Sequence, residues 1–145
     1  MATRCLLDIN VLIALMDPDH AFHHRAHDWW GGKARPWASC PLTENGLLRI
    51  MASSGYSKTI CFSVAEIQAR LAMFVANSDH DFWTDSISIR DARHFQQSAI
   101  LTSKQLTYVY LLALAVENHG CLVTFDRHIP LVAVRSASAT HLEVI

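Results

Sequence analysis

The segment "RCLLDINVLIAL" at residues 4–15 carries one carboxylate, Asp8, inside an otherwise apolar run. The residues before Asp8 predict a short strand at 4–7, and those after it predict a short helix that stops before Pro18. A carboxylate buried without a partner is very costly. Asp8 should therefore lie at an edge, beside a cation, a metal ion or a network of hydrogen bonds.

The composition is typical of a folded protein with one domain, residues 1–145. Hydrophobic residues make up 51% of the chain and charged residues 17%, which excludes a disordered protein. The net charge of −1 creates no global basic field, so any nucleic-acid binding would need a local patch. The apolar runs are too short to span a membrane, and Asp8 and Asn10 interrupt any secretory signal. Four cysteines without a CxxC pair indicate reduced thiols, so we expect a cytoplasmic protein without membrane association.

Strand and helix signals alternate along the chain. Capping boxes at residues 63–66 and 102–105 mark two helix starts, and Asp19 and Gly31 are the expected N-cap and stop of another helix. The predicted helices span residues 11–17, 19–31, 43–52, 63–76 and 102–118, and the predicted strands 4–7, 35–41, 81–89 (a short strand with a turn), 121–126 and 141–145. This alternation predicts an α/β fold with a parallel sheet covered on both faces.

Three carboxylates are expected to converge at one edge of that sheet. Asp8 and Asp126 follow predicted strands, and Glu44 begins the helix after the second strand. Hard oxygen ligands favour Mg²⁺ or Mn²⁺, and such an ion activates water and neutralises phosphate charge. Asn10 and Thr124 stand two residues from the aspartates and would orient them or hold a water on the metal. The pattern indicates a metal-dependent phosphodiesterase; the alternative is helix caps and surface carboxylates.

Four motifs, in order, give the chain a family resemblance. They read "LLDINVLIAL", "CPLTENGLLRI", "QLTYVYLLALA" and "LVTFDR", and the chain resembles the PIN-domain ribonucleases, most closely the VapC-type toxins of bacterial toxin–antitoxin pairs. The resemblance implies a three-layer α/β/α fold with a parallel sheet of about five strands. It also implies an Mg²⁺-dependent endoribonuclease that hydrolyses RNA phosphodiesters with a metal-activated water. The implied partners are RNA, a VapB-type antitoxin that inserts a segment into the cleft, and a second copy of the chain in a homodimer.

The same resemblance assigns the acidic positions and identifies one departure. Asp8, Glu44 and Asp126 match acidic ligands of the family, whereas Tyr108 stands where the family has an aspartate. A phenol, with an unperturbed pKa of ~10, is a poor Mg²⁺ ligand and is bulkier than aspartate. Either a natural member has lost activity here, or a toxin has been disarmed; the second is favoured because the change hits a catalytic position in an intact motif.

The expected function is therefore a toxin endoribonuclease impaired at Tyr108. The alternative is an inactive PIN-fold module that binds an antitoxin or RNA. Two other classes with aspartates at strand ends are excluded. A receiver domain would need an acidic pair after the first strand, and a D-x-D phosphatase would need a second aspartate where this chain has Asn10.

Several basic and histidine side chains leave alternatives open. Arg49 would reach the acidic cluster or an RNA phosphate, or would simply be a solvated helix residue. A phosphate-binding patch, or a mere scatter of surface charge, is formed by Lys104, Arg127, His128 and Arg135. Three or four histidines share one helix face and would either bind Zn²⁺ or take part in packing or dimer contact with Trp29 and Trp30: His20, His23, His24 and His27.

Overall fold

The computed structural model describes residues 2–31, 35–100 and 102–145. Five strands in these ranges form one parallel sheet in the order β3-β2-β1-β4-β5. The strands are β1 (Cys5–Leu7), β2 (Trp37–Ser39), β3 (His80–Phe82), β4 (Cys121–Thr124) and β5 (Leu142–Val144). The residues of β1, β2 and β4 are all buried, whereas β3 and β5 form the partly exposed edges. This burial pattern is that of a parallel sheet covered on both faces.

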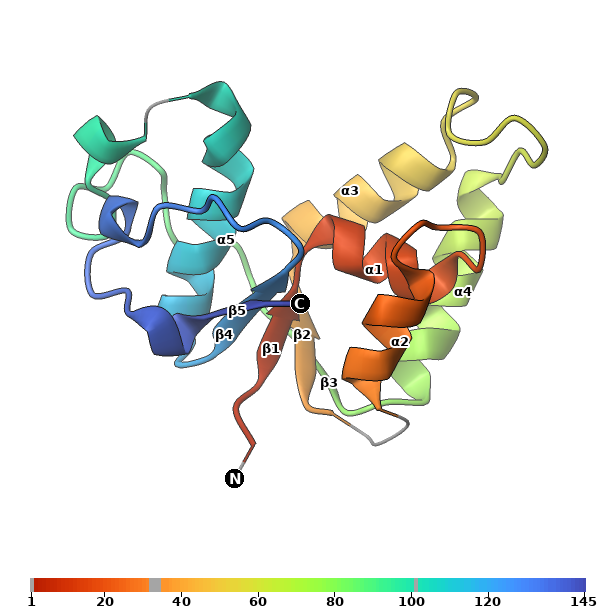
Figure 1. The fold of residues 1–145 in the computed structure, drawn as a ribbon, viewed down its shortest axis with the longest axis horizontal. Coiled ribbons are helices and arrows are strands. Elements are labelled where there is room, and N and C mark those ends of the chain that lie inside the picture. Colours follow the sequence, from red (N-terminus) through yellow and green to blue (C-terminus); the bar gives the residue numbers. More distant parts are fainter. Residues whose placement is uncertain (1, 32–34, 101) are drawn as a thin grey trace.

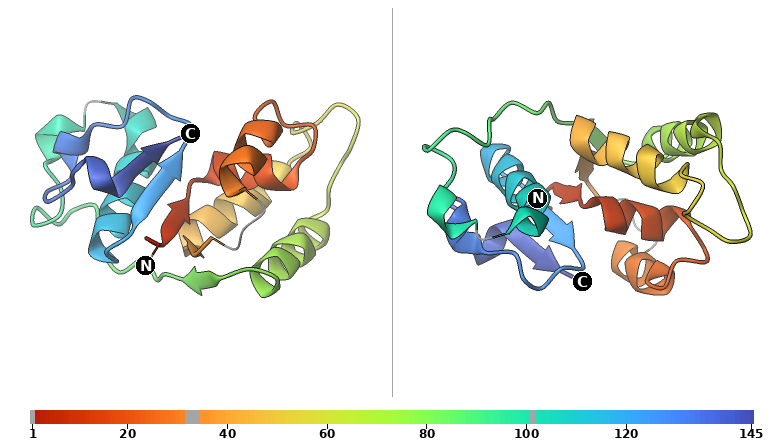
Figure 2. Two further views of the ribbon diagram at one scale, coloured as in Figure 1. Left: turned by 60° about the horizontal axis from the view of Figure 1, so that its bottom comes forward. Right: turned by 90° about the horizontal axis from the view of Figure 1, so that it is seen from above.

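The helices divide between the two faces of the sheet (Figures 1 and 2). They are α1 (Ile9–Met16), α2 (His23–Trp30), α3 (Pro41–Met51), α4 (Val64–Ala76) and α5 (Leu106–Glu117). Leu7 belongs to the core with α1 to α4, and its strand neighbour Leu6 belongs to the core with α5. Alternate residues of a strand therefore pack into two separate hydrophobic cores, one on each face of the sheet. The expected three-layer α/β/α fold with five parallel strands is confirmed.

Several local predictions are confirmed by the backbone. The Ser63 N–H donates to Glu66 and the Glu66 N–H to Ser63 Oγ, which completes the capping box of α4. The box at residues 102–105 opens a short 3-10 helix that runs into α5. Gly31 ends α2 with a φ of 69°, a left-handed conformation that glycine adopts without strain.

Other boundaries differ from the predictions for identifiable reasons. Asp19 is not an N-cap. Its N–H donates to the Asp17 carboxylate and so forms a turn, and α2 begins after this turn, at His23. The helix α3 begins at Pro41, two residues before the predicted start. The Cys40 N–H donates to Thr43 Oγ1, and proline is favoured in the first turn because it has no N–H to satisfy.

The strands are shorter than the sequence predicts. A strand is predicted at residues 81–89, but the segment that pairs with the sheet is 80–82. The strand β4 ends at Thr124 rather than at Asp126. Among the described residues, no helix combines the length and the apolar character needed to cross a membrane.

Candidate active site

Two aspartates lie at the carboxyl edge of the central strands. Leu7 of β1 pairs with Val123 of β4, and the Asp8 N–H donates to the Val123 carbonyl at 3.0 Å. Asp8 is also the residue that precedes α1, and Asp126 follows β4 by two residues. The two aspartates therefore come from neighbouring strands that end at the same edge.

Thr124 links the two aspartates through hydrogen bonds. Its buried hydroxyl donates to Asp8 Oδ2 at 2.8 Å and accepts from the Asp126 N–H at 3.1 Å. The His128 N–H in turn donates to Asp126 Oδ1 at 2.7 Å. One threonine thus fixes the position of both acidic residues.

The Asp8 carboxyl is buried, with only 2% of the residue exposed. Burial raises its pKa to about 6. Hydrogen bonds from Thr124 and from the Ile9 N–H oppose this rise, and the charge of Asp126 adds to it. Among the described residues, no lysine or arginine forms an ion pair with Asp8. A cation at this edge would relieve both the burial and the repulsion.

Tyr108 lies on the first turn of α5, beside both aspartates. It lines a cavity of about 270 Å³ together with Asp8 and Asn10, and a second cavity of about 520 Å³ together with Asp126. Burial raises the pKa of the Tyr108 phenol, and the negative charges of Asp8 and Asp126 raise it further. The phenol therefore stays protonated at neutral pH, in the position where the resemblance places a carboxylate.

Part of the predicted basic patch borders the same cavities. Lys104 is exposed and lines both of them, and His128 lines the cavity of Asp126. Arg127 is exposed but lines neither cavity. Arg135 points elsewhere, since its Nε donates to the Ala92 carbonyl at 2.6 Å. Arg49 is an exposed residue near the end of α3 and borders neither cavity.

Glu44 does not join the two aspartates. Its carboxylate accepts a hydrogen bond from Ser39 Oγ, and it lines a separate cavity between α3, α4 and β3, together with His80. His80 Nε2 lies 2.7 Å from Ser39 Oγ. Because Ser39 gives its only proton to Glu44, the Nε2–H tautomer of His80 must donate to Ser39. The expected convergence of three carboxylates is replaced by two aspartates at β1 and β4, and one glutamate held at β2.

Sequence reasoning missed Ser39 and His80. They lie 41 positions apart, and no spacing rule connects them. Burial lowers the pKa of His80, while the nearby Glu44 charge opposes this shift. The register of β2 against β3 brings the two residues together, because Ser39 and its neighbours pair with residues 80–82.

The histidine face of α2 makes backbone contacts. His23 Nδ1 lies 2.7 Å from the Ala14 carbonyl and His27 Nε2 lies 2.9 Å from the Leu15 carbonyl, so each ring donates to the last turn of α1. His20 lies before α2 and not on its predicted histidine face, and its Nδ1 accepts from the Phe22 N–H. These contacts favour packing of α2 on α1 over a zinc site.

The chemistry of the acidic edge fits a hard divalent cation. Asp8 and Asp126 offer carboxylate oxygens, and Asn10 borders the same cavity as Asp8. Mg²⁺ is commonly held by one or two carboxylates while it keeps several waters. These oxygen donors fit such an ion, whereas the phenol of Tyr108, which lines the same cavities, is a poor ligand for it.

Comparison with known proteins places the whole chain in one group. No family model matches the chain. The chain is 43% identical over 143 residues to Ribonuclease VapC44 of Mycobacterium tuberculosis, which covers 98% of this chain and 99% of that protein. It is 34% identical over 141 residues to Ribonuclease VapC39 of the same organism, with 97% and 98% covered. A third relative, Ribonuclease VapC29, is 33% identical over 121 residues, with 83% and 84% covered.

Proposed function

The chain belongs to the VapC-type PIN-domain toxins, and on this premise we propose that it is the endoribonuclease toxin of a toxin–antitoxin pair, impaired by Tyr108. The observation that carries the proposal is the match to ribonucleases over nearly the full length of both chains. The proposed substrate is RNA, and the proposed partners are a VapB-type antitoxin and a second copy of the chain. The proposed location is the cytoplasm.

The two central aspartates are proposed to hold Mg²⁺, or Mn²⁺ in its place. Such an ion, when bound, supplies neutralisation of phosphate charge and activation of a water for attack on the phosphodiester. The Thr124 hydroxyl holds the Asp8 carboxylate and the backbone N–H of Asp126, and the His128 N–H holds the Asp126 carboxylate. Lys104 is exposed and lines both cavities, so it could bind a phosphate oxygen of the RNA. Hydrolysis of this kind leaves a 5′-phosphate and a 3′-hydroxyl.

Glu44 is proposed as a supporting acid rather than a direct ligand. The resemblance assigns it an acidic ligand position, but its carboxylate accepts from Ser39 and faces the cavity between α3 and α4. Residues that hold or orient the direct ligands of a metal also affect its binding, and their loss commonly lowers metal affinity or activity by about 10–100-fold.

The impairment by Tyr108 has two separable causes. The phenol is bulkier than a carboxylate and lines the cavity of each aspartate, and it lacks the negative charge that an aspartate would add. A protonated phenol neither attracts a cation nor leaves room for its hydration shell. We expect weak metal binding and little RNA cleavage by the unaltered chain.

The decisive test compares the unaltered chain with Tyr108→Asp and Tyr108→Asn. Mg²⁺ and Mn²⁺ binding is measured by calorimetry, and cleavage of total cellular RNA is measured on gels. Tyr108→Asp should bind metal and cut RNA. Tyr108→Asn removes the bulk without adding charge and should recover only a small part of either property.

A second function is favoured by Tyr108 together with the hydrogen bond that holds Glu44 on Ser39. If no variant binds metal or cuts RNA, the chain is better described as an inactive PIN-fold module that binds an antitoxin or RNA. Cleavage by the unaltered chain at the rate of Tyr108→Asp would contradict the proposed impairment.

A further inference from the structure

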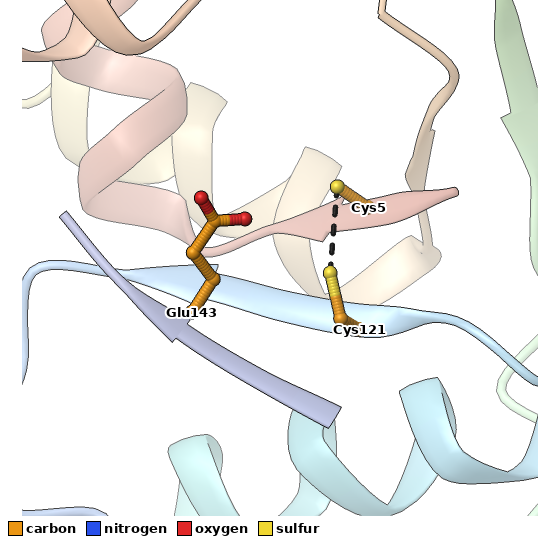
Figure 3. Close-up of side chains that lie close together, drawn as sticks. All are labelled: Cys5, Cys121 and Glu143. Atoms are coloured by element: carbon orange, nitrogen blue, oxygen red, sulfur yellow. Dashed lines mark hydrogen bonds between the residues drawn. The ribbon is translucent and has the colours of Figure 1, made fainter. Parts of the chain in front are cut away.

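Three potential metal ligands share the sheet face that packs against α1 and α2, away from the aspartates. Cys5 of β1 pairs with Cys121 of β4, and Val123 of β4 pairs with Glu143 of β5. Alternate residues of a strand share a face, so the side chains of Cys5, Cys121 and Glu143 rise on the same side (Figure 3). One ligand atom from each residue lies within 4.8 Å of the others.

The two sulfur atoms are buried and already in contact. Only 5% of Cys5 and 6% of Cys121 is exposed, and both are free thiols. The Cys121 thiol donates to Cys5 Sγ at 3.4 Å. The two sulfur atoms are therefore close enough to bind one ion together.

The carboxylate of Glu143 is held in place by a tryptophan. Trp29 of α2 donates from Nε1 to Glu143 Oε1 at 2.9 Å. A hydrogen bond of this kind orients a carboxylate while leaving its second oxygen available to a metal. The Arg35 guanidinium lies 4.4 Å from the centre of the Trp29 ring, so a positive charge stands close to the group.

The charges of the group match those of a divalent cation. Two thiolates and one carboxylate carry three negative charges, which a divalent ion and Arg35 balance together. Thiolate ligands select Zn²⁺ over Mg²⁺, and carboxylates are also accepted by Zn²⁺. Three protein ligands leave the fourth position of a tetrahedral ion to a water.

We propose that Cys5, Cys121 and Glu143 form a Zn²⁺ site that is separate from the acidic edge. Binding releases the two thiol protons to solvent, and no oxidation takes place. Because the ligands come from three adjacent strands, the ion would tie β1, β4 and β5 together at the face covered by α2. The proposal does not depend on ribonuclease activity.

The test uses Co²⁺ as a spectroscopic substitute for Zn²⁺. The full chain is prepared with Cys61→Ser, which removes the exposed cysteine, and with excess Mg²⁺ to occupy the oxygen ligands. One equivalent of Co²⁺ should produce a thiolate-to-metal charge-transfer band that Zn²⁺ abolishes. Asp126→Asn should leave the band unchanged, because that residue belongs to the other site.

Variants of the three ligands complete the test. Cys5→Ala and Cys121→Ala should remove the band. Glu143→Gln keeps both thiols and an acceptor for Trp29, and should weaken Co²⁺ binding by about tenfold or more. Far-UV circular dichroism checks that each variant is folded; if an alanine variant unfolds, Glu143→Gln decides. The proposal is overturned if the unaltered thiols give no band, if Glu143→Gln binds as tightly, or if thiol counting finds the two cysteines joined as a disulfide.

Discussion

The carboxyl edge of the sheet carries two polar clusters that are completed in different ways. At β1 and β4, Thr124 bonds to the carboxylate of Asp8 and to the backbone N–H of Asp126, and the two aspartates line cavities bordered by Tyr108. At β2 and β3, Glu44 is satisfied by Ser39, which is itself bound to His80. The first cluster keeps unneutralised negative charge in a buried position, whereas the second is closed by protein hydrogen bonds. A bound cation would therefore gain more electrostatic stabilisation at β1 and β4 than at β2 and β3.

Substitutions in the two clusters should lower RNA cleavage and metal affinity to different extents. In the Tyr108→Asp background, Asp126→Asn should lower RNA cleavage and metal affinity by more than about 100-fold, because a direct ligand exceeds the usual cost of an outer residue. Glu44→Gln should lower them by about 10–100-fold. Cleavage assays and calorimetry measure both. Equal losses would show that Glu44 leaves Ser39 and joins the aspartates when metal binds.

The next effect concerns stability and pH at Asp8. Because burial raises the folded-state pKa of Asp8 to about 6 from 3.8, the folded state holds a proton that the unfolded state releases between these values. Stability contributed by Asp8 is therefore present below about pH 4 and is lost as pH rises to about 6, by about 3 kcal/mol without metal.

Urea unfolding in a chelator, at pH values from 4 to 7, checks this sign. Asp8→Asn has no titrating group and should remove that fall in stability, so the difference between the two proteins isolates Asp8 from every other group. Adding Mg²⁺ to a Tyr108→Asp chain should restore stability at pH 7. A difference between the two proteins that stays constant with pH would contradict the burial of a charged Asp8.

The smallest effect concerns the closed cluster. Ser39→Ala removes the partner of both Glu44 and His80, but these two side chains are only partly buried and regain water. We expect a loss of about 1 kcal/mol in the free energy of unfolding. The exposed Ser53→Ala, by contrast, should change it by less than about 0.5 kcal/mol. If Ser39→Ala instead lowers the free energy of unfolding by about 3 kcal/mol, as expected for buried groups left without a partner, water does not reach this cluster.

The sequence predicts the framework better than the direction of side chains. Asp8 could be placed at the end of β1 because a single carboxylate interrupts an apolar run. The partner of Glu44 could not be predicted, since Ser39 and His80 meet only through the register of β2 and β3. The predicted start of α2 is too early. The Asp17 carboxylate accepts from the Asp19 N–H and forms a turn that the helix pattern of the sequence does not indicate.

The position of Tyr108 has a consequence at the level of the gene. Four other parts of the acidic edge are in place, namely both aspartates, the threonine that links them and the lysine that lines their cavities. The codons for tyrosine and aspartate differ only in their first base. Under the proposed function, one nucleotide therefore separates an impaired toxin from one with an aspartate at this position. A cell that carries this frame without a matching antitoxin would be under selection against that single substitution.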